Sequence, residues 1–254
     1  MGASALSKVQ KKIEKRDWVF SRLQEVHRSD YNLLAAKTIP MEKIALLTLE
    51  LAVVFVLIPL LLYYRLIPNA PIPFLIVLAL AAWFILRADP AFDRSHLTNM
   101  AALGKNLGPL LLRSAALCAV LGLAVWRIAP HLLFTFVKRA PAFWAVVMVL
   151  YPVLSVYPQE LIFRAYFFER YQPLFGAGWA MIAASALAFG FVHIALGNWL
   201  SVALSTIGGL LFALTYQQSG SLILACIEHA IFGNFIFTIG LGQFFYHGTR
   251  LKTG

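Results

Sequence analysis

Long runs of hydrophobic residues recur along the chain and dominate its pattern. Seven apolar segments, each bounded by charged residues, proline or glycine, cover residues 44–64, 71–87, 109–127, 142–169, 177–196, 199–216 and 221–240. A bilayer-spanning helix needs about 20 apolar residues, and about 17–25 are tolerated. The pattern therefore predicts an all-α fold, a polytopic transmembrane helical bundle of about seven to eight spanning helices.

The fourth segment is longer than one span and contains Pro152 and Pro158. Proline lacks a backbone N–H and clashes with the preceding helical turn, so we expect a kink or a break there. A further half-span near residues 157–170 would supply the eighth helix. The pattern divides the chain into four parts, namely a cationic N-terminal segment, N-terminal transmembrane helices, a second transmembrane part and a short C-terminal tail, at residues 1–43, 44–141, 142–240 and 241–254.

Composition and charge support a membrane setting. Hydrophobic residues make up 61% of the chain and charged residues only 13%, against about 25% charged residues in soluble domains. The net charge is +10, and nine of the 21 Lys and Arg fall within residues 1–43. Beside membrane spans, this charge indicates a cytoplasmic N-terminus and attraction to membrane lipids rather than nucleic-acid binding. We expect a multi-pass protein of a bacterial inner (plasma) membrane, with residues 5–28 either an interfacial helix or a frayed charged tail.

Ionisable residues inside the spans are the candidates for chemistry, because each costs about 2.5–3.5 kcal/mol on insertion scales. Glu160 and Arg164 are four residues apart, so they share a helical face and can form an ion pair. We expect Glu50 and Arg113 to pair with each other or to reach the interface. Glu228 could orient a histidine, but its adjacency on a helix argues against direct contact with His229. The full set is Glu50, Arg113, Glu160, Arg164, His193, Glu228 and His229, with Gln159 and Asn234 as polar neighbours.

Glu160, His193 and His229 come from three different spans and can reach a similar depth in the bilayer. Such a set suits two kinds of hydrolysis. The three side chains could bind a divalent metal such as zinc and leave a fourth position for water. Alternatively, no metal is needed: the carboxylate and one imidazole activate water, while the other histidine and an asparagine stabilise the oxyanion.

Three stretches of residues 157–240 resemble the motifs of the CAAX-prenyl-protease and bacteriocin-processing (CPBP) family of intramembrane endopeptidases. Its EExxxR motif is similar to Gln159–Arg164, its FxxxH motif to Phe189–His193, and its HxxxN motif to the stretch that starts at His229. The resemblance implies an intramembrane protease that cleaves a membrane-associated polypeptide. It also implies that Glu160, His193, His229, Asn234 and Gln159 form the catalytic site, with Arg164 in an ion pair.

Two positions depart from the family motifs. Gln159 stands where the family has the glutamate usually assigned as the water-activating base, so Glu160 would have to serve instead. Gly233 stands four residues after His229, where the motif has asparagine, and Asn234 follows one position later. A residue at i+5 points about 140° away from the histidine, so Asn234 can join the site only through a local π-type bulge.

Three functions therefore remain open. The first is an intramembrane endopeptidase that uses water activated by glutamate and histidine. The second, favoured by Gln159, is a catalytically inactive relative that binds a peptide or partner in the same cavity. The third is a transporter, because intramembrane Glu, Arg and His also line proton paths.

Overall fold

The computed structural model describes residues 40–68 and 71–246. These residues are almost entirely helical, and the described part of the chain contains no strand, which confirms the expected all-α bundle. The chain divides into two units between residues 45 and 46, and nearly all of the described residues belong to the second unit. The helix expected over residues 5–28 and most of the C-terminal tail lie outside the described residues.

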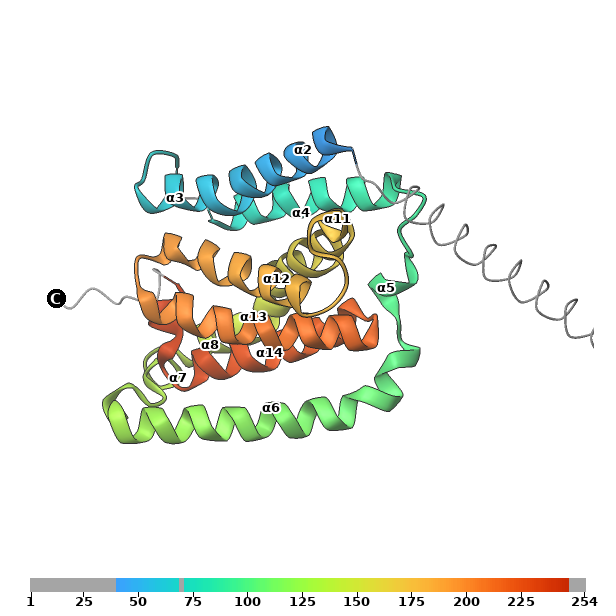
Figure 1. Ribbon diagram of the computed structural model, residues 1–254. Helices are drawn as coiled ribbons and strands as arrows, with labels where there is room; N and C mark the ends of the chain where they lie inside the picture. The colour runs from blue at the N-terminus through green and yellow to red at the C-terminus, as the bar shows by residue number, and fades with distance from the viewer. Residues whose placement is uncertain (1–39, 69–70, 247–254) are drawn as a thin grey trace, which may run out of the picture. The chain divides into compact units, whose positions relative to one another are not determined.

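Two groups of helices follow one another along the chain (Figure 1). The first group ends before the region of the family resemblance: α2 (Met41–Ala52), the π-helix η1 (Val53–Leu57), α3 (Ile58–Tyr63), α4 (Pro71–Ala88), α5 (Ser95–Thr98), α6 (Ala101–Ile128), η2 (Pro130–Leu132) and α7 (Thr135–Arg139). The second group carries that region: α8 (Pro141–Tyr151), η3 (Pro152–Val156), α9 (Tyr157–Glu160), η4 (Leu161–Tyr166), α10 (Phe167–Arg170), α11 (Gln172–Phe175), α12 (Trp179–Val192), η5 (His193–Leu196), α13 (Trp199–Ser219), α14 (Leu222–Thr238) and η6 (Leu241–Phe244).

The seven expected apolar segments each correspond to helix, but they differ in length. In the described residues, five continuous helices are long and apolar enough to cross a membrane, and two are shorter, Ile72–Ala88 and Leu222–Thr238. The elements from α8 to α10 form one continuous helix, Pro141–Arg170, which is called the fourth helix below. Residues 157–170 belong to it, so they do not form a separate half-span. The third helix starts at Ala101, eight residues before the expected segment 109–127, because the end of the preceding polar connection is also helical.

The prolines of the fourth helix change its winding without breaking it. Pro152 opens the π-helix η3, and a second π-helix, η4, follows Glu160. A π-turn removes the demand for an i to i−4 hydrogen bond at each residue, so it accommodates a missing proline N–H. Of the two expected outcomes, a kink or a break, the break does not occur, because residues 141–170 form one continuous helix.

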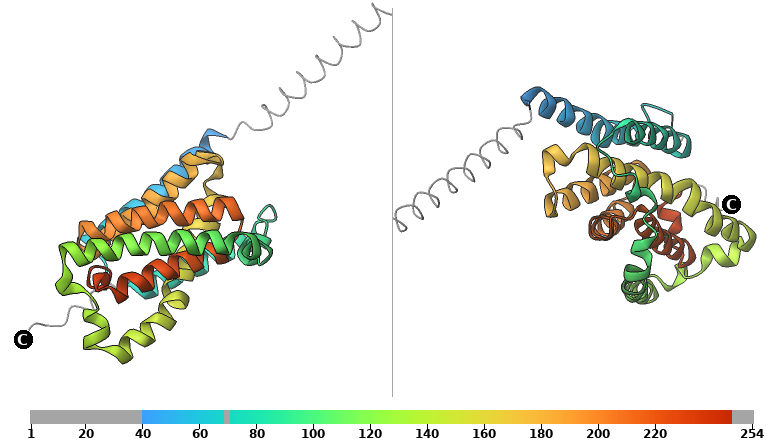
Figure 2. Two further views of the ribbon diagram at one scale, coloured as in Figure 1. Left: turned by 90° about the horizontal axis from the view of Figure 1, so that it is seen from below. Right: turned by 90° about the vertical axis from the view of Figure 1, so that its right-hand side faces the viewer.

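This fourth helix lies at the centre of the second unit. Helices α4, α12 and α14 all contact its η4 segment. Helices α12 and α13 pack against each other over their length, and α6 lies along α14 (Figures 1 and 2). Residues from distant parts of the sequence therefore meet around residues 151–170.

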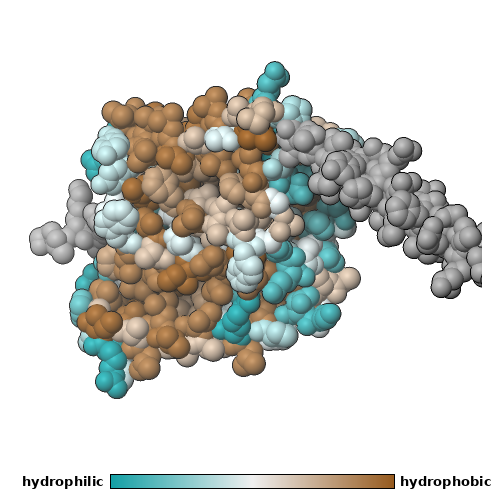
Figure 3. Space-filling model, viewed as in Figure 1, coloured by the Kyte–Doolittle hydropathy of each residue, from teal (hydrophilic) through white to brown (hydrophobic). Residues whose placement is uncertain are grey.

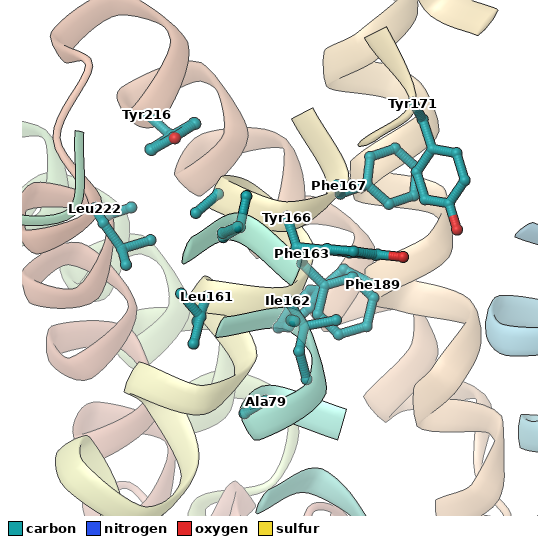
Figure 4. Close-up of a cluster of buried hydrophobic side chains, with 14 of the residues drawn as sticks. Ala79, Leu161, Ile162, Phe163, Tyr166, Phe167, Tyr171, Phe189, Tyr216 and Leu222 are labelled. Carbon is teal, nitrogen blue, oxygen red and sulfur yellow. The ribbon is translucent and has the colours of Figure 1, made fainter. Parts of the chain in front are cut away.

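Aromatic side chains fill the core on one side of η4 (Figure 4). The Phe55 ring meets the rings of Phe163, Phe167 and Tyr171 edge to face, at centroid distances of 5.4, 5.3 and 5.9 Å. Phe163 also meets Phe189 of α12 at 5.1 Å. These edge-to-face pairs contribute beyond their buried area and hold η4 in one orientation.

The outer surface suits a lipid environment. On the face shown in Figure 3, hydrophobic residues form a broad band, and hydrophilic residues gather at its edges. Large apolar side chains such as Leu112, Val149 and Leu187 are mostly exposed. A water-soluble protein rarely exposes such a continuous apolar surface, so these helices face hydrocarbon.

Two of the ionisable residues singled out above pair differently from what the sequence predicts. Glu50 accepts hydrogen bonds from Arg170, Tyr166 and Tyr171, and it does not pair with Arg113. The carboxylate lies where α2 packs beside the end of the fourth helix. Glu50 thus ties two spans together.

Arg113 of α6 pairs with Glu228 of α14. The Arg113 Nε and Nη2 atoms lie 3.1 and 2.5 Å from Glu228 Oε1, and Thr215 donates to Glu228 Oε2 at 2.5 Å. The Glu228 side chain is fully buried. Glu228 does not take the possible role of orienting a histidine, because its two oxygens accept from Arg113 of α6 and Thr215 of α13.

Candidate active site

Glu160 lies at the meeting point of the fourth helix and α14. It is the last residue of α9, directly before η4, and it is 0% exposed. Its Oε1 lies 2.8 Å from His229 Nδ1, and its Oε2 lies 3.1 Å from Arg164 Nε. The structure thus brings Glu160, Arg164 and His229 together in one buried cluster.

Arg164 neutralises the Glu160 carboxylate and is itself fully buried. Its Nη1 donates to Ser185 of α12 and its Nη2 to the carbonyl of Gly209, each at 3.4 Å. The guanidinium carbon also lies 5.0 Å from the Phe189 ring centroid. Such partners are what an ion pair needs when it is removed from water.

The contact between Arg164 and Glu160 is an ion pair without the alignment of a hydrogen bond. Glu160 Oε2 and Arg164 Nε therefore have no hydrogen-bond partner among the described residues. Glu160 Oε2 can therefore still accept a hydrogen bond from a water molecule or from an N–H group of the substrate.

The His229 imidazole is fixed on several sides. It stacks on the Phe212 ring at 4.6 Å, with an interplanar angle of 13°, and meets the Phe189 ring edge to face at 5.4 Å. Its Nε2 lies 3.1 Å from the Tyr151 hydroxyl. Because a carboxylate only accepts hydrogen bonds, neutral His229 carries its proton on Nδ1 and presents a lone pair on Nε2.

His193 lies beside this cluster. It is the first residue of η5, and its ring centroid lies 4.9 Å from that of Phe189, which also contacts His229. Its Nδ1 lies 2.7 Å from the Phe189 carbonyl. A carbonyl also only accepts, so neutral His193 presents the lone pair of Nε2 as well.

Gln159 and Asn234 make their hydrogen bonds elsewhere. Gln159 Nε2 donates to Ser155 on its own helix at 2.6 Å. Asn234 Nδ2 donates to the Met148 carbonyl at 3.2 Å. Helix α14 is a regular α-helix from Leu222 to Thr238, so the bulge that Asn234 needs in order to join His229 is absent.

The expected metal ligands do not form a metal-type group. Among the described residues, no three His, Cys, Asp or Glu side chains lie close enough to hold one ion. His229 Nδ1 faces the Glu160 carboxylate, and the other oxygen of that carboxylate faces Arg164. A zinc site of Glu160, His193 and His229 therefore does not fit these side chains, and no metal-dependent step is derived.

Sequence reasoning missed Tyr151, Ser185 and Phe212, all of which contact the cluster. Nothing in their local sequence marks them: Ser185 and Phe212 reach the site from α12 and α13, and Tyr151 lies nine residues before Glu160 on the same helix. For Tyr151 one signal was present, since Gly233 leaves room where the family motif has asparagine. The phenol uses that room.

Comparison with known proteins finds a family model that matches the part of the chain that carries this cluster. Residues 140–236 match the family model described as type II CAAX prenyl endopeptidase Rce1-like, and this stretch contains Glu160, Arg164, His193 and His229. No curated protein and no solved structure matches the chain. The matched family is a protease family, and the helices mark an integral membrane protein. The match over residues 140–236 supports the resemblance of this part of the chain to the CPBP family of intramembrane endopeptidases.

Proposed function

We propose that the chain is an intramembrane endopeptidase that hydrolyses a peptide bond with water activated by Glu160 and His229. The observation that carries this proposal is the buried 2.8 Å contact between Glu160 Oε1 and His229 Nδ1. A base whose second nitrogen is held by a carboxylate is the arrangement that hydrolytic enzymes use to activate a nucleophile.

The proposed reaction proceeds in two proton transfers. His229 Nε2 takes a proton from water as the water oxygen attacks the carbonyl carbon of the scissile bond. Glu160 stabilises the imidazolium that forms, and Arg164 holds Glu160 through their ion pair. The imidazolium then gives its proton to the leaving nitrogen as the carbon–nitrogen bond breaks. This general base and acid chemistry supplies about 10²–10⁴-fold in rate.

The second imidazole has a supporting role in this proposal. His193 Nε2 accepts a hydrogen bond from the other hydrogen of the water or from a peptide N–H of the substrate. No step is assigned to Gln159 or Asn234, because their side chains bond to Ser155 and to the Met148 carbonyl.

The proposed substrate is a membrane-associated protein or peptide that reaches the site within or near the bilayer. Glu160 is 0% exposed, so the scissile bond must enter between the helices instead of resting on the surface. The bias of Lys and Arg toward residues 1–43 supports a cytoplasmic N-terminus. The membrane proposed for the chain is a bacterial inner membrane.

Cleavage by the purified chain in proteoliposomes tests the proposal, with a panel of membrane-associated peptides and mass spectrometry of the products. The wild type is expected to cleave at least one peptide. His229→Gln should lower kcat by at least about 100-fold, and His193→Gln should also lower it, whereas Asn234→Ala should stay within a few-fold of wild type. Undiminished cleavage by His229→Gln, or no cleavage by the wild type, would overturn the proposal.

A second candidate is a relative that binds a peptide without cutting it. Gln159 favours it, because this side chain occupies the family's glutamate position and bonds to Ser155. For this candidate, the wild type binds panel peptides without cleavage and Gln159→Glu gains hydrolysis. Cleavage by the wild type excludes it.

A further inference from the structure

Tyr151 reaches His229 from the same continuous helix that carries Glu160 and Arg164, nine residues before Glu160. It is the last residue of α8, directly before η3. Its hydroxyl lies 3.1 Å from His229 Nε2, and its ring meets that of Phe237 edge to face at 5.2 Å. The side chain is thus held at the one imidazole nitrogen that Glu160 leaves open.

Gly233 makes this position of Tyr151 available. A Cβ atom built on Gly233 would collide with the Cε1, Cζ and hydroxyl oxygen atoms of Tyr151. The phenol head therefore occupies the volume into which any side chain at residue 233 would project. Residue 233 is four positions after His229, which is the place of the asparagine in the HxxxN motif. The Tyr151 hydroxyl, a donor from α8, therefore occupies the space that the side chain of that asparagine, a donor from α14, would enter.

The hydroxyl can change partner during the proposed reaction. In the resting site, neutral His229 has a lone pair on Nε2, so the Tyr151 O–H donates to it. Nε2 has a single lone pair, so the Tyr151 O–H turns away from it when the water approaches to give its proton. The O–H is thus free at the moment when negative charge develops on the substrate oxygen, and an interaction made only then lowers the barrier.

We propose that the Tyr151 hydroxyl is an oxyanion donor, which stabilises the tetrahedral intermediate of peptide hydrolysis in place of the motif's asparagine. The inference rests on the proposed endopeptidase function. No covalent bond to Tyr151 forms or breaks: the O–H turns from His229 Nε2 to the oxyanion and returns when the imidazolium has given its proton to the leaving nitrogen.

The first test is Tyr151→Phe, assayed on a peptide that the wild type cleaves in proteoliposomes. The ring that packs on Gly233 and Phe237 is kept, and only the hydroxyl is lost. Removal of one oxyanion donor typically costs about 10²–10³-fold in kcat, and we expect a fall of that size with KM nearly unchanged. Wild-type kcat in Tyr151→Phe would overturn this inference alone, whereas a wild type that cleaves nothing would overturn it together with the proposed function.

A second test separates hydrogen bonding from packing. Tyr151→Ala empties the space beside Gly233, and two double variants refill it with side chains of similar size: Tyr151→Ala/Gly233→Asn and Tyr151→Ala/Gly233→Leu. Only the asparagine can donate a hydrogen bond. We expect it to recover at least tenfold in kcat over Tyr151→Ala, and leucine to recover none. Equal recovery by both would show a packing role and overturn the inference.

Discussion

Removal of the Arg164 charge should destabilise the fold more than any substitution at an exposed arginine. In Arg164→Met the Glu160 carboxylate, 0% exposed, loses its counter-charge 3.1 Å away. Removal of one partner of a buried pair costs about 3–5 kcal/mol. Glu160 keeps its 2.8 Å contact with His229, so we expect the lower end, about 3 kcal/mol, which is roughly a hundredfold in the folding equilibrium.

Unfolding of the purified protein in mixed detergent micelles, followed by circular dichroism, measures this loss. The matched control is Arg127→Met, an exposed arginine over the Trp126 ring, which should change stability by less than about 0.5 kcal/mol. The double variant Glu160→Gln/Arg164→Met should be more stable than Arg164→Met, because no uncompensated charge remains. The argument for a buried ion pair is refuted if Arg164→Met is as stable as Arg127→Met. It is also refuted if the double variant is less stable than Arg164→Met.

Two further substitutions can be measured in the same unfolding assay. Arg113→Met should cost about 3 kcal/mol, since it leaves the Glu228 carboxylate buried with only Thr215 as donor; a cost equal to that of Arg127→Met would contradict this. Gly190→Val should cost about 1–3 kcal/mol by overpacking, because a Cβ there collides with Thr206. Addition of Thr206→Ala should recover part of the loss, and no recovery would show that the collision is not the cause.

Much of the fold could be predicted from the sequence, because a helix that crosses a bilayer needs about 20 consecutive apolar residues. The segments 177–196 and 199–216 correspond closely to the helices that begin at Trp179 and Trp199. The behaviour of the fourth segment could not be predicted, because proline can be accommodated either by a break or by π-turns. The choice depends on the helices packed around Pro152, which the local pattern does not contain.

The same division applies to the site. Glu160 and Arg164 share a helix, so their spacing alone predicts their contact. The pairing of Arg113 with Glu228 joins residues 115 positions apart, and no local pattern distinguishes that partner from Glu50. The Tyr151 contact depends on the missing side chain of Gly233, a feature that acquires meaning only when α8 and α14 are placed side by side.

The kcat of Glu160→Gln on a peptide cleaved by the wild type tests the central claim most directly. Glutamine keeps the size of the side chain but removes the charge that orients His229 and stabilises its imidazolium. The account predicts a fall of at least about 100-fold, while Gln159→Ala, one position earlier, stays within a few-fold of wild type. Wild-type cleavage by Glu160→Gln would contradict the claim that this carboxylate activates the water.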